Sequence, residues 1–387
     1  MRIAKDDPIL IIGAGPAGLL TAVALRQHGF SRIRVLDQSP GSAWAAGIAQ
    51  VPAWLWTGTE TEGLAAFLRE AGRPWQHFEV RTMQGQVLHE KSLAGLPLTP
   101  LGLDMTTLYD WVQTQLGDTE IVGGREFISF TQDERKVQAH FTDGYSESAA
   151  LLIGADGLRS RVRLQMQGNN ELRLFDLATW WARCDTSLLT GDLADLATSP
   201  YAEYWGQGIR GAVVTAGNGQ AGLSLTTPVP AQHPVPTDEA AAWLAQTFAD
   251  TPFTDAIAGL EPSAWQMAQH ADLPPFRGWS DGRVVLAGMA AFPHVPLFDM
   301  SSGLLLRGAF ALARHLDAHR KRLDRAFAAY EKEIRRPAAL FNRVARSYAG
   351  HYAQRQGLSY RLRNAVFSGL PGSLTVDPWY QIIEGQK

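Results

Sequence analysis

Three glycines near the N terminus have the spacing of a phosphate-binding turn. Gly13, Gly15 and Gly18 follow an apolar run that begins at residue 9, and apolar residues then recur at helical spacing to residue 25. A second apolar run ends in Asp37. A strand, a tight turn, a helix and a second strand that ends in an acid make up the dinucleotide-binding signature. The stretch therefore predicts a site for the pyrophosphate and ribose of a dinucleotide.

Each residue type in this stretch has a physical task. Gly13 permits the tight turn, Gly15 lets backbone amides approach the pyrophosphate, and Gly18 lets the helix pack closely on the strand. The helix N terminus adds unpaired N–H groups and a positive dipole, and the acid can accept a hydrogen bond from a ribose hydroxyl. The predicted dinucleotide-binding residues of this stretch are Gly13, Gly15, Pro16, Ala17, Gly18 and Asp37.

The competing interpretation of the N terminus is a secretory signal peptide. Arg2 and Lys5 precede the apolar run, as basic residues do in such signals. Asp6 and Asp7 then stand where a signal has no acids, and the glycines have no role in one. The dinucleotide interpretation is therefore favoured.

Composition limits the classes of protein to which the chain can belong. Of its 387 residues, 45% are hydrophobic and 19% are charged, which is enough for a globular core of two or so lobes. The net charge of −3 gives no electrostatic argument for binding nucleic acid. Cys184 is the single cysteine, which excludes internal disulfides and Cys-cluster metal sites. No apolar run approaches a membrane span, and we expect a cytoplasmic protein.

Two later stretches also run from an apolar strand into glycine. The stretch 151–163 passes through Asp156 and Gly157 into a basic helix start. The other stretch is a predicted buried strand that ends in Gly288, and a loop then leads to a predicted helix from Gly303. Further helices are expected over 61–72, 105–116, 238–249 and 323–336. The last of these is expected to stop at Pro337, with another helix over 338–352. Strands are expected over 121–130 and 179–183.

One glycine motif is a false match. Residues 217–222 also read G-x-G-x-x-G, but a strand-like run follows them instead of a helix. Asn218-Gly219 between two apolar runs is typical of a hairpin turn. We therefore predict a hairpin at 217–222 and a single dinucleotide-binding motif at the N terminus.

Taken together, Gly13–Gly18, the Gly-Ala-Asp-Gly stretch at 154–163 and the strand 282–288 resemble the motifs of the group A flavoprotein monooxygenases, the FAD-dependent aromatic hydroxylases. The resemblance extends from residue 8 to about residue 364. It implies an α/β fold in which a Rossmann-type FAD-binding domain is interleaved with a β-sheet substrate domain and followed by C-terminal helices. The implied FAD-binding parts are 1–75, 101–170 and 276–340, the substrate parts are 76–100 and 171–275, and the helical segment is 341–387.

The resemblance also implies a chemistry. Family members use FAD, NAD(P)H as co-substrate and O2 to oxidise an electron-rich ring, and their nicotinamide cofactor has no nucleotide fold of its own. Asp156 and Gly157 would lie near the pyrophosphate, with Asp156 also a candidate structural anchor, and Gly288 and Gly303 would complete the FAD site. We expect a small-molecule substrate and a monomer or homodimer.

Several positions depart from the family pattern. Met289 and Phe292 stand where the family has an aspartate and a histidine, and Leu305 and Phe310 stand where polar residues are expected. The arginine and the basic residue expected near the cofactor are replaced by Met105 and Gln38. Each lost hydrogen bond to a charged group costs about 1.5–3 kcal/mol, so FAD binding is expected to be weaker. Polar residues that can compensate are Asp299, Ser301 and Ser302.

Candidate residues for the reaction remain open to two interpretations each. His294 is a candidate general acid or base, or an exposed loop histidine. Tyr204 and Trp205 can stack on a substrate, or fill the core. Arg210 and Arg183 can meet an acidic substrate, or be solvated or paired surface charges. Pro296 and Asp299 are further substrate-site candidates, and the tryptophans that can line an aromatic pocket or fill the core are Trp44, Trp54, Trp56, Trp180, Trp181 and Trp205.

Two functions follow. The first is an FAD-dependent monooxygenase that hydroxylates or epoxidises an aromatic or polyketide-like molecule, with the flavin supplying the chemistry. The second keeps the fold but has lost redox use of FAD, and acts as a cyclase, isomerase or lyase, or only binds a ligand. No metal-ligand spacing such as H-E-x-x-H is present, so no metal site is predicted.

Overall fold

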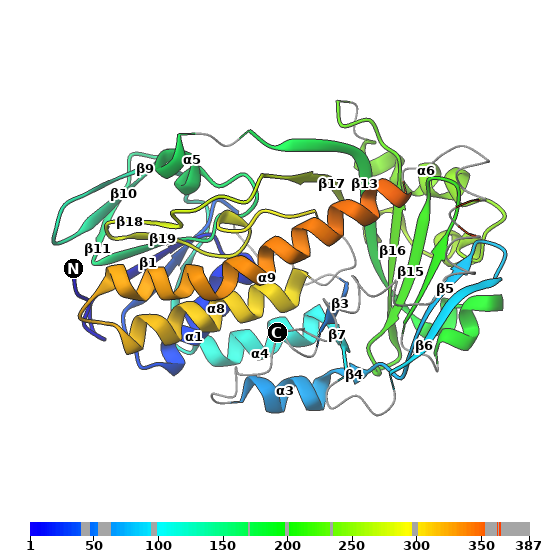
Figure 1. Ribbon diagram of the computed structural model, residues 1–387, viewed down its shortest axis with the longest axis horizontal. Helices are drawn as coiled ribbons and strands as arrows, with labels where there is room; N and C mark the ends of the chain where they lie inside the picture. Colours follow the sequence, from blue (N-terminus) through cyan, green and yellow to red (C-terminus); the bar gives the residue numbers. More distant parts are fainter. Residues whose placement is uncertain are drawn as a thin grey trace.

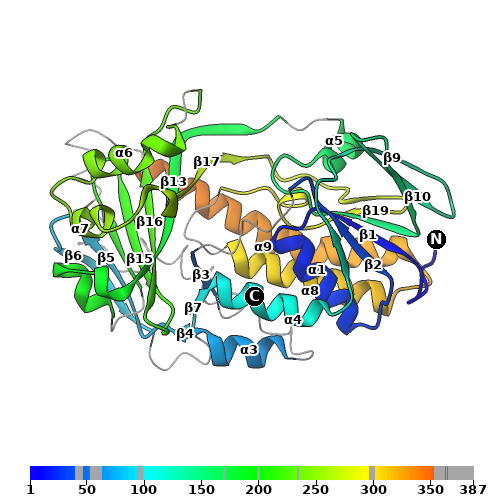
Figure 2. The same cartoon turned by 180° about the vertical axis from the view of Figure 1, so that it is seen from behind.

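The computed structural model describes residues 1–39, 47–52, 63–93, 99–168, 171–197, 201–232, 235–295 and 301–352, together with residues 362 and 364. Two large sheets lie at opposite ends of an elongated molecule (Figures 1 and 2). The N terminus lies at the end that holds a six-stranded, mostly parallel sheet, and a seven-stranded, mostly antiparallel sheet forms the other end.

The six-stranded sheet brings the three glycine-containing stretches together. Its central strand β1 (Ile9–Ile12) pairs in parallel with β2 (Ile33–Leu36) on one side and with β12 (Leu151–Gly154) on the other. The outer strands are β8 (Glu120–Val122) beside β2, β19 (Val284–Leu286) beside β12, and β18 (Ser280–Asp281) beside β19. Because parallel strands end at the same edge, stretches that are far apart in the chain become neighbours there.

Helices cover this sheet. Helix α8 (Ser301–Ala318) lies between α1 (Pro16–Gln27) and α9 (Leu323–Tyr352) (Figure 1). Residues 17–25 of α1 are all buried because the helix is covered by the sheet and by α8. The other helices and small strands of this half are α3 (Leu64–Ala71), α4 (Met105–Leu116), α5 (Arg161–Gln167), β9 (Phe127–Gln132), β10 (Val137–Phe141), β11 (Ser146–Ala149), β3 (Ile48–Val51), β4 (Arg73–Pro74) and β7 (Leu101–Asp104).

The central strands of the seven-stranded sheet are buried on both faces. Its strands, in spatial order, are β17 (Gln266–Asp272), β13 (Arg173–Asp185), β16 (Gln220–Thr227), β15 (Arg210–Thr215), β14 (Tyr201–Trp205), β5 (His77–Thr82) and β6 (Val87–Ser92). The outer face packs against α6 (Ala240–Thr247) and α7 (Thr254–Ala258). Strand β3 packs against the inner face, where Ile48 lies so close to Gly222 that a Cβ there has no room. Because side chains alternate between the two faces of a sheet, neighbouring residues of one strand pack into different hydrophobic cores.

Most predicted elements are present, with two differences. Helix α4 spans the predicted 105–116, and Gly217 and Gly219, both with positive φ, form the predicted hairpin between β15 and β16. The predicted strand 121–130 is broken into β8 and β9. The predicted stop at Pro337 is wrong, because α9 continues through it. Proline costs a helix interior about 3 kcal/mol, and the buried Ile334, Ala338 and Phe341 provide packing that offsets this cost.

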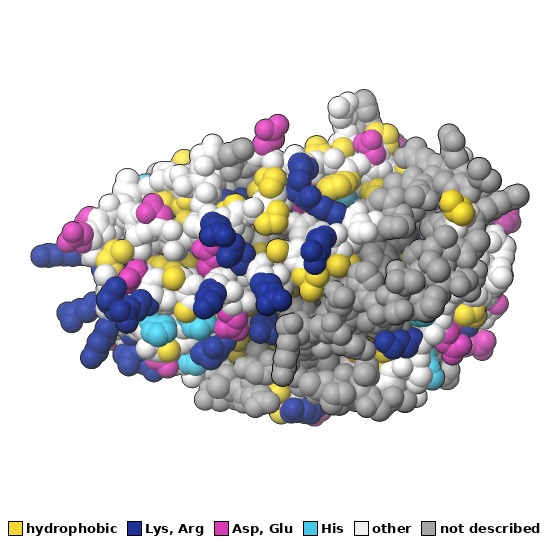
Figure 3. All heavy atoms as spheres, in the orientation of Figure 1, with side chains coloured by type: hydrophobic (Ala, Val, Ile, Leu, Met, Phe, Trp, Pro, Cys, Tyr) yellow, Lys and Arg dark blue, Asp and Glu magenta, His cyan; other side chains and the backbone are white. Residues whose placement is uncertain are grey.

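The surface near the α8–α9 turn is rich in basic side chains (Figure 3). Arg320 pairs with Asp317 at 3.2 Å and Arg322 pairs with Asp324 at 2.7 Å, so acids lie among these bases. Such exposed pairs contribute little to stability. No helix within the described ranges is long and apolar enough to cross a membrane.

Candidate functional site

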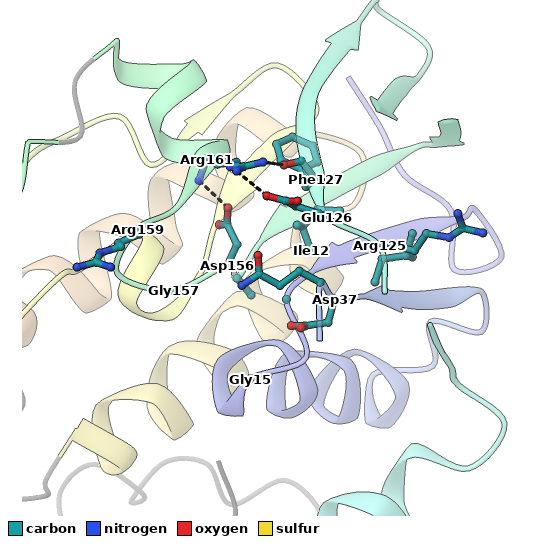
Figure 4. Close-up of a pocket in the computed structure, with 14 residues that line it drawn as sticks. Ile12, Gly15, Asp37, Arg125, Glu126, Phe127, Asp156, Gly157, Arg159 and Arg161 are labelled. Carbon is teal, nitrogen blue, oxygen red and sulfur yellow. Dashed lines mark hydrogen bonds and ion pairs between the residues drawn. The ribbon is translucent and has the colours of Figure 1, made fainter. Parts of the chain in front are cut away.

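A cavity of about 440 Å³ opens at the edge where β1, β2 and β12 end (Figure 4). Gly13 and Gly15 line it from the turn after β1, and Asp37 lines it from the end of β2. Asp156 and Gly157 line it from the turn after β12. The structure therefore brings the predicted dinucleotide-binding residues of two separate stretches to one cleft. The other lining residues are Ile12, Leu36, Gln38, Arg125, Glu126, Phe127, Ala155, Arg159 and Arg161.

The glycine turn leaves the N terminus of α1 open toward this cleft. Gly13 has φ +107°, and a Cβ there would collide with the Ala155 carbonyl. A Cβ at Gly18 would collide with the Gly13 carbonyl, so helix and strand pack as closely as predicted. Gly15 is the N-cap of α1 and provides no side-chain cap, and no atom lies within 4 Å of a Cβ built on it. The first N–H groups of the helix therefore face space that an anion can occupy.

The Asp37 carboxylate is held in place by the backbone. Its Oδ2 accepts a hydrogen bond of 2.7 Å from the Ala14 N–H, and its Oδ1 accepts one of 2.7 Å from the Ser39 N–H. Each carboxylate oxygen can accept more than one hydrogen bond. The carboxylate is thus fixed at the cleft with capacity left for a ribose hydroxyl.

Asp156 serves chiefly as a structural anchor. Its carboxylate accepts hydrogen bonds from the Ser160 hydroxyl at 2.6 Å and from the backbone N–H groups of Arg161 and Val162 at 2.8 and 3.1 Å. Burial raises the pKa of Asp156, although these hydrogen bonds act in the opposite direction. The Asp156 side chain thus caps the start of α5. Gly157, which has a positive φ of +78°, forms part of the turn that lines the cleft.

Arg163 joins the second glycine stretch to the third. Its guanidinium donates hydrogen bonds to the carbonyls of Met289 at 3.2 Å, Ala290 at 3.0 Å and Leu158. Burial lowers its pKa to about 10. At the same junction Gly288 has φ +60°, and a Cβ there would collide with Ala17. Sequence reasoning missed the role of Arg163, although the Val-Arg pair that ends the second motif was a signal.

Three positions at which the family resemblance implies polar residues are apolar and packed. Phe292, Leu305 and Phe310 are all less than 9% exposed. The Phe292 ring lies 5.7 Å from that of Trp279, and a Cβ built on Gly308 would touch it at 3.2 Å. These three side chains therefore pack in the core and can donate no hydrogen bond to a cofactor. Gly303 lies buried in the first turn of α8, whereas Pro296 and Asp299 lie outside the described residues.

His294 is buried, so the alternative of an exposed loop histidine is wrong. The side chain is 1% exposed, and its Nδ1 donates a hydrogen bond of 2.9 Å to the Phe292 carbonyl. Its ring meets that of Phe341 edge-on at 4.8 Å. Burial lowers the pKa of His294 to about 4, although the carbonyl partner favours the charged form. His294 is therefore neutral near pH 7, and the general acid or base role stays a hypothesis.

Tyr204 and Trp205 lie on opposite faces of the seven-stranded sheet. Tyr204 meets Phe253 edge-on at 5.4 Å in the outer core, where Trp180 is also buried. Trp205 faces inward and donates from Nε1 to the Glu203 carboxylate at 2.7 Å. Adjacent strand residues point in opposite directions, so one substrate cannot stack on both rings.

Arg210 is a buried charge. It is fully buried, and its guanidinium lies 2.7 Å from the carboxylate of Glu203, which is itself buried. Tyr201 also donates its hydroxyl to Glu203. Although burial alone would raise the pKa of Glu203, the charge of Arg210 and these hydrogen bonds lower it. The surface-charge alternative thus fails for Arg210, whereas Arg183 is 38% exposed and pairs with Asp104 at 2.8 Å.

Other chemistry is not supported by the part of the chain that is described. No group of three His, Cys, Asp or Glu side chains there is placed to hold a metal. Cys184 is buried, and burial raises the pKa of its thiol to about 11. A thiol with a raised pKa is a poor nucleophile, so Cys184 is a core residue.

Comparisons with known proteins cover nearly the whole chain. A family model described as FAD binding domain matches residues 6–343. The chain is 28% identical over 332 residues to the aurachin C monooxygenase/isomerase of Stigmatella aurantiaca, with 84% of each chain covered. It is 28% identical over 313 residues to the 2-heptyl-3-hydroxy-4(1H)-quinolone synthase of Pseudomonas aeruginosa, covering 79% of this chain and 80% of that one. The fold matches the crystal structure of Klebsiella pneumoniae HpxO complexed with FAD and uric acid with a TM-score of 0.82 at 22% identity, covering 97% of this chain and 96% of that one.

Proposed function

The chain belongs to the family defined by this FAD-binding domain, and from that premise we propose that it uses NAD(P)H and O2 to hydroxylate or epoxidise a small aromatic or polyketide-like molecule. Family membership makes it an FAD-dependent oxidoreductase of the monooxygenase kind. The observation that carries the proposal is the open cleft, which is lined both by the uncapped N terminus of α1 and by Asp37.

The residues around the cleft fit the ADP half of FAD. The open space at Gly15 accepts a pyrophosphate beside the first amides of α1, and the fixed carboxylate of Asp37 accepts a ribose hydroxyl. When bound, FAD supplies the exchange of electrons with NAD(P)H and O2. Arg163 positions the Met289 backbone beside α1. We propose that the other predicted cofactor residues also belong to the FAD site; these are Gly13, Pro16, Ala17, Gly18, Asp156, Gly157, Gly288 and Gly303.

The relatives suggest the kind of ring that is oxidised. The name of the Pseudomonas aeruginosa relative gives a hydroxylated 4(1H)-quinolone as its product. Such a ring is electron-rich, flat and uncharged, and it suits a water-excluding pocket that holds an aromatic substrate. We propose a heteroaromatic substrate of this kind, held against the inner face of the seven-stranded sheet.

A second function, without redox use of FAD, is favoured by one observation. Phe292, Leu305 and Phe310, at positions where the family resemblance implies polar residues, are packed apolar side chains, and the name of the Stigmatella relative includes an isomerase activity. Under this alternative the pocket catalyses an isomerisation or cyclisation that consumes no oxygen.

One series of measurements tests both functions. The purified protein is titrated with FAD and its visible spectrum is recorded, and NAD(P)H oxidation is then followed with and without a 4(1H)-quinolone. A monooxygenase binds FAD and consumes O2 in step with the quinolone, with a gain of one oxygen atom in the product. No flavin binding, or turnover that is equal in the absence of O2, would contradict the monooxygenase and favour the alternative.

A further inference from the structure

The inner face of the seven-stranded sheet carries a row of buried polar side chains across four strands. Arg210 on β15 pairs with Thr226 on β16, and Thr226 pairs with Thr179 on β13. The Thr179 hydroxyl lies 2.8 Å from the Thr226 hydroxyl and 2.7 Å from Nε2 of His270 on β17. None of these side chains is more than 1% exposed. The row is therefore sealed from solvent on the face against which β3 packs.

The buried charges of this row cancel. Arg210 is the buried cation, and the carboxylate of Glu203 lies 2.7 Å from it. At the β17 edge, Arg173 and Arg346 share the carboxylate of Asp272, and their side chains are 42% and 31% exposed. A ligand against the centre of the row therefore meets a neutral pair and no uncompensated charge.

Two polar side chains beside this pair have hydrogen-bonding atoms that no described residue satisfies. Gln50 on β3 is fully buried, and its amide nitrogen and oxygen both lack a partner within that set. His270 is fully buried, and its Nδ1 lacks a partner among the same residues. Native proteins pair the large majority of buried polar atoms. Two unsatisfied buried side chains, one on β3 and one in the row of the facing sheet, therefore indicate a ligand that completes their bonds.

Both side chains are connected to the ion pair through neighbouring residues. The Gln50 amide lies beside the Tyr201 hydroxyl without a bond of good geometry, and that hydroxyl accepts a bond of 3.2 Å from Arg210. His270 follows Thr226 and Thr179 in the row that begins at Arg210, and burial and the charge of Arg210 lower its pKa to about 3. His270 is therefore neutral at any ordinary pH and can offer one donor or one acceptor.

We propose that Gln50 and His270 recognise the substrate, and that the substrate is an uncharged heteroaromatic ring carrying an N–H donor and a carbonyl or hydroxyl acceptor. The inference rests on the proposed function and names the substrate class of that site. An amide offers a donor and an acceptor together, which complements a ring N–H and C=O. A carboxylate substrate would lose its hydration beside Glu203 and find the buried cation already paired, so the site selects against it.

The test uses the full-length, FAD-loaded enzyme and two ligands with the same ring system. Flavin absorbance changes report the Kd of 4(1H)-quinolone, which is neutral, and of quinoline-4-carboxylate, which is charged. The native enzyme is expected to bind the quinolone at least about tenfold more tightly. Gln50→Leu and His270→Phe are each expected to weaken quinolone binding about tenfold, with FAD affinity unchanged.

Stability separates recognition from a merely structural role. Gln50→Leu removes no hydrogen bond of good geometry, so its Tm is expected to equal or exceed that of the native protein while quinolone binding weakens. His270→Phe also removes the bond to Thr179, so Gln50→Leu carries the test if His270→Phe loses stability. The matched controls are Gln138→Leu and His140→Phe on the distant strand β10, which are expected to bind both ligands as the native enzyme does.

Two results would overturn the inference. One is tighter binding of the carboxylate than of the quinolone. The other is a Gln50→Leu variant that loses stability but binds the quinolone like the native enzyme. Failure of the proposed function is a separate result, in which the quinolone binds in a Gln50-dependent manner but stimulates neither NAD(P)H oxidation nor O2 consumption.

Discussion

Replacing Gly15 with aspartate places a carboxylate where the pyrophosphate is proposed to bind. The backbone at Gly15 has φ −69° and ψ 179°, which any residue adopts, and no atom lies within 4 Å of the added Cβ. The substitution should therefore leave the fold intact. Two unit charges about 4–6 Å apart repel by about 3–4 kcal/mol at an effective dielectric constant near 20. Since the cleft is open to solvent, we discount this value for screening to about 2–3 kcal/mol.

The expected result is FAD binding weakened about 30- to 150-fold in Gly15→Asp, measured by titrating FAD into apoprotein and following flavin fluorescence at two salt concentrations. Gly15→Asn is the matched control, because it has the same shape without the charge, and it should bind FAD within a few-fold of the native protein. The loss in Gly15→Asp should shrink at high salt. Equal FAD affinity of Gly15→Asp and the native protein would refute the placement of the pyrophosphate at this helix.

Three further predictions concern the core and the flavin side of the site. Glu203→Gln leaves Arg210 buried without its countercharge and should lower the free energy of unfolding by about 3–5 kcal/mol in urea titrations. The double variant with Arg210→Met should restore most of the lost stability. A change below about 0.5 kcal/mol in the single variant would contradict the geometry of the pair. If only the ribitol contact is missing, Met289→Asp should tighten FAD binding about tenfold relative to Met289→Asn. Equal affinities in the FAD titration would show that the loop does not place residue 289 at the ribitol. His294 has a folded pKa of about 4, below its unfolded value, so it contributes stability at neutral pH that is lost as pH falls from about 6.5 toward 4, by about 2–3 kcal/mol at pH 4.5. Denaturation midpoints of His294→Phe should fall less steeply over this range than those of the control His140→Phe, whose histidine is only half-buried. Parallel curves would count against burial of a neutral ring.

Local features of the sequence were sufficient for the nucleotide-binding half of the fold. A short stretch of sequence is enough to interpret Gly13, Gly18 and the acid after the second strand, because turn geometry and helix–strand packing act between near neighbours. The false match at 217–222 was rejected for the same reason, since its neighbours form a hairpin. Pro337 shows the limit of such reasoning, because a local cost was outweighed by packing that involves other elements.

Which candidate substrate residues share a face of the sheet was not predicted from the sequence, and the reason is geometric. Tyr204 and Trp205 are adjacent in sequence, so sequence reasoning grouped them, yet strand alternation sends them to different cores. That alternation was itself a signal, because it places Glu203 on the same face as Trp205. Gln50 and His270 gave no such signal, because their significance lies in atoms left unpaired when distant strands meet.

The sequence by itself thus determined the dinucleotide motif, the α/β class and the family resemblance, since each depends on residue types at short or regular spacing. The tertiary structure alone decided which charges are buried and paired, which histidines are neutral, and which side chains line the inner face of the sheet. Burial and pairing are set by strand register and by the packing of one sheet against another part of the chain. Arg210 illustrates the difference: in sequence it is a cation beside a strand, and in the fold it is half of a neutral pair.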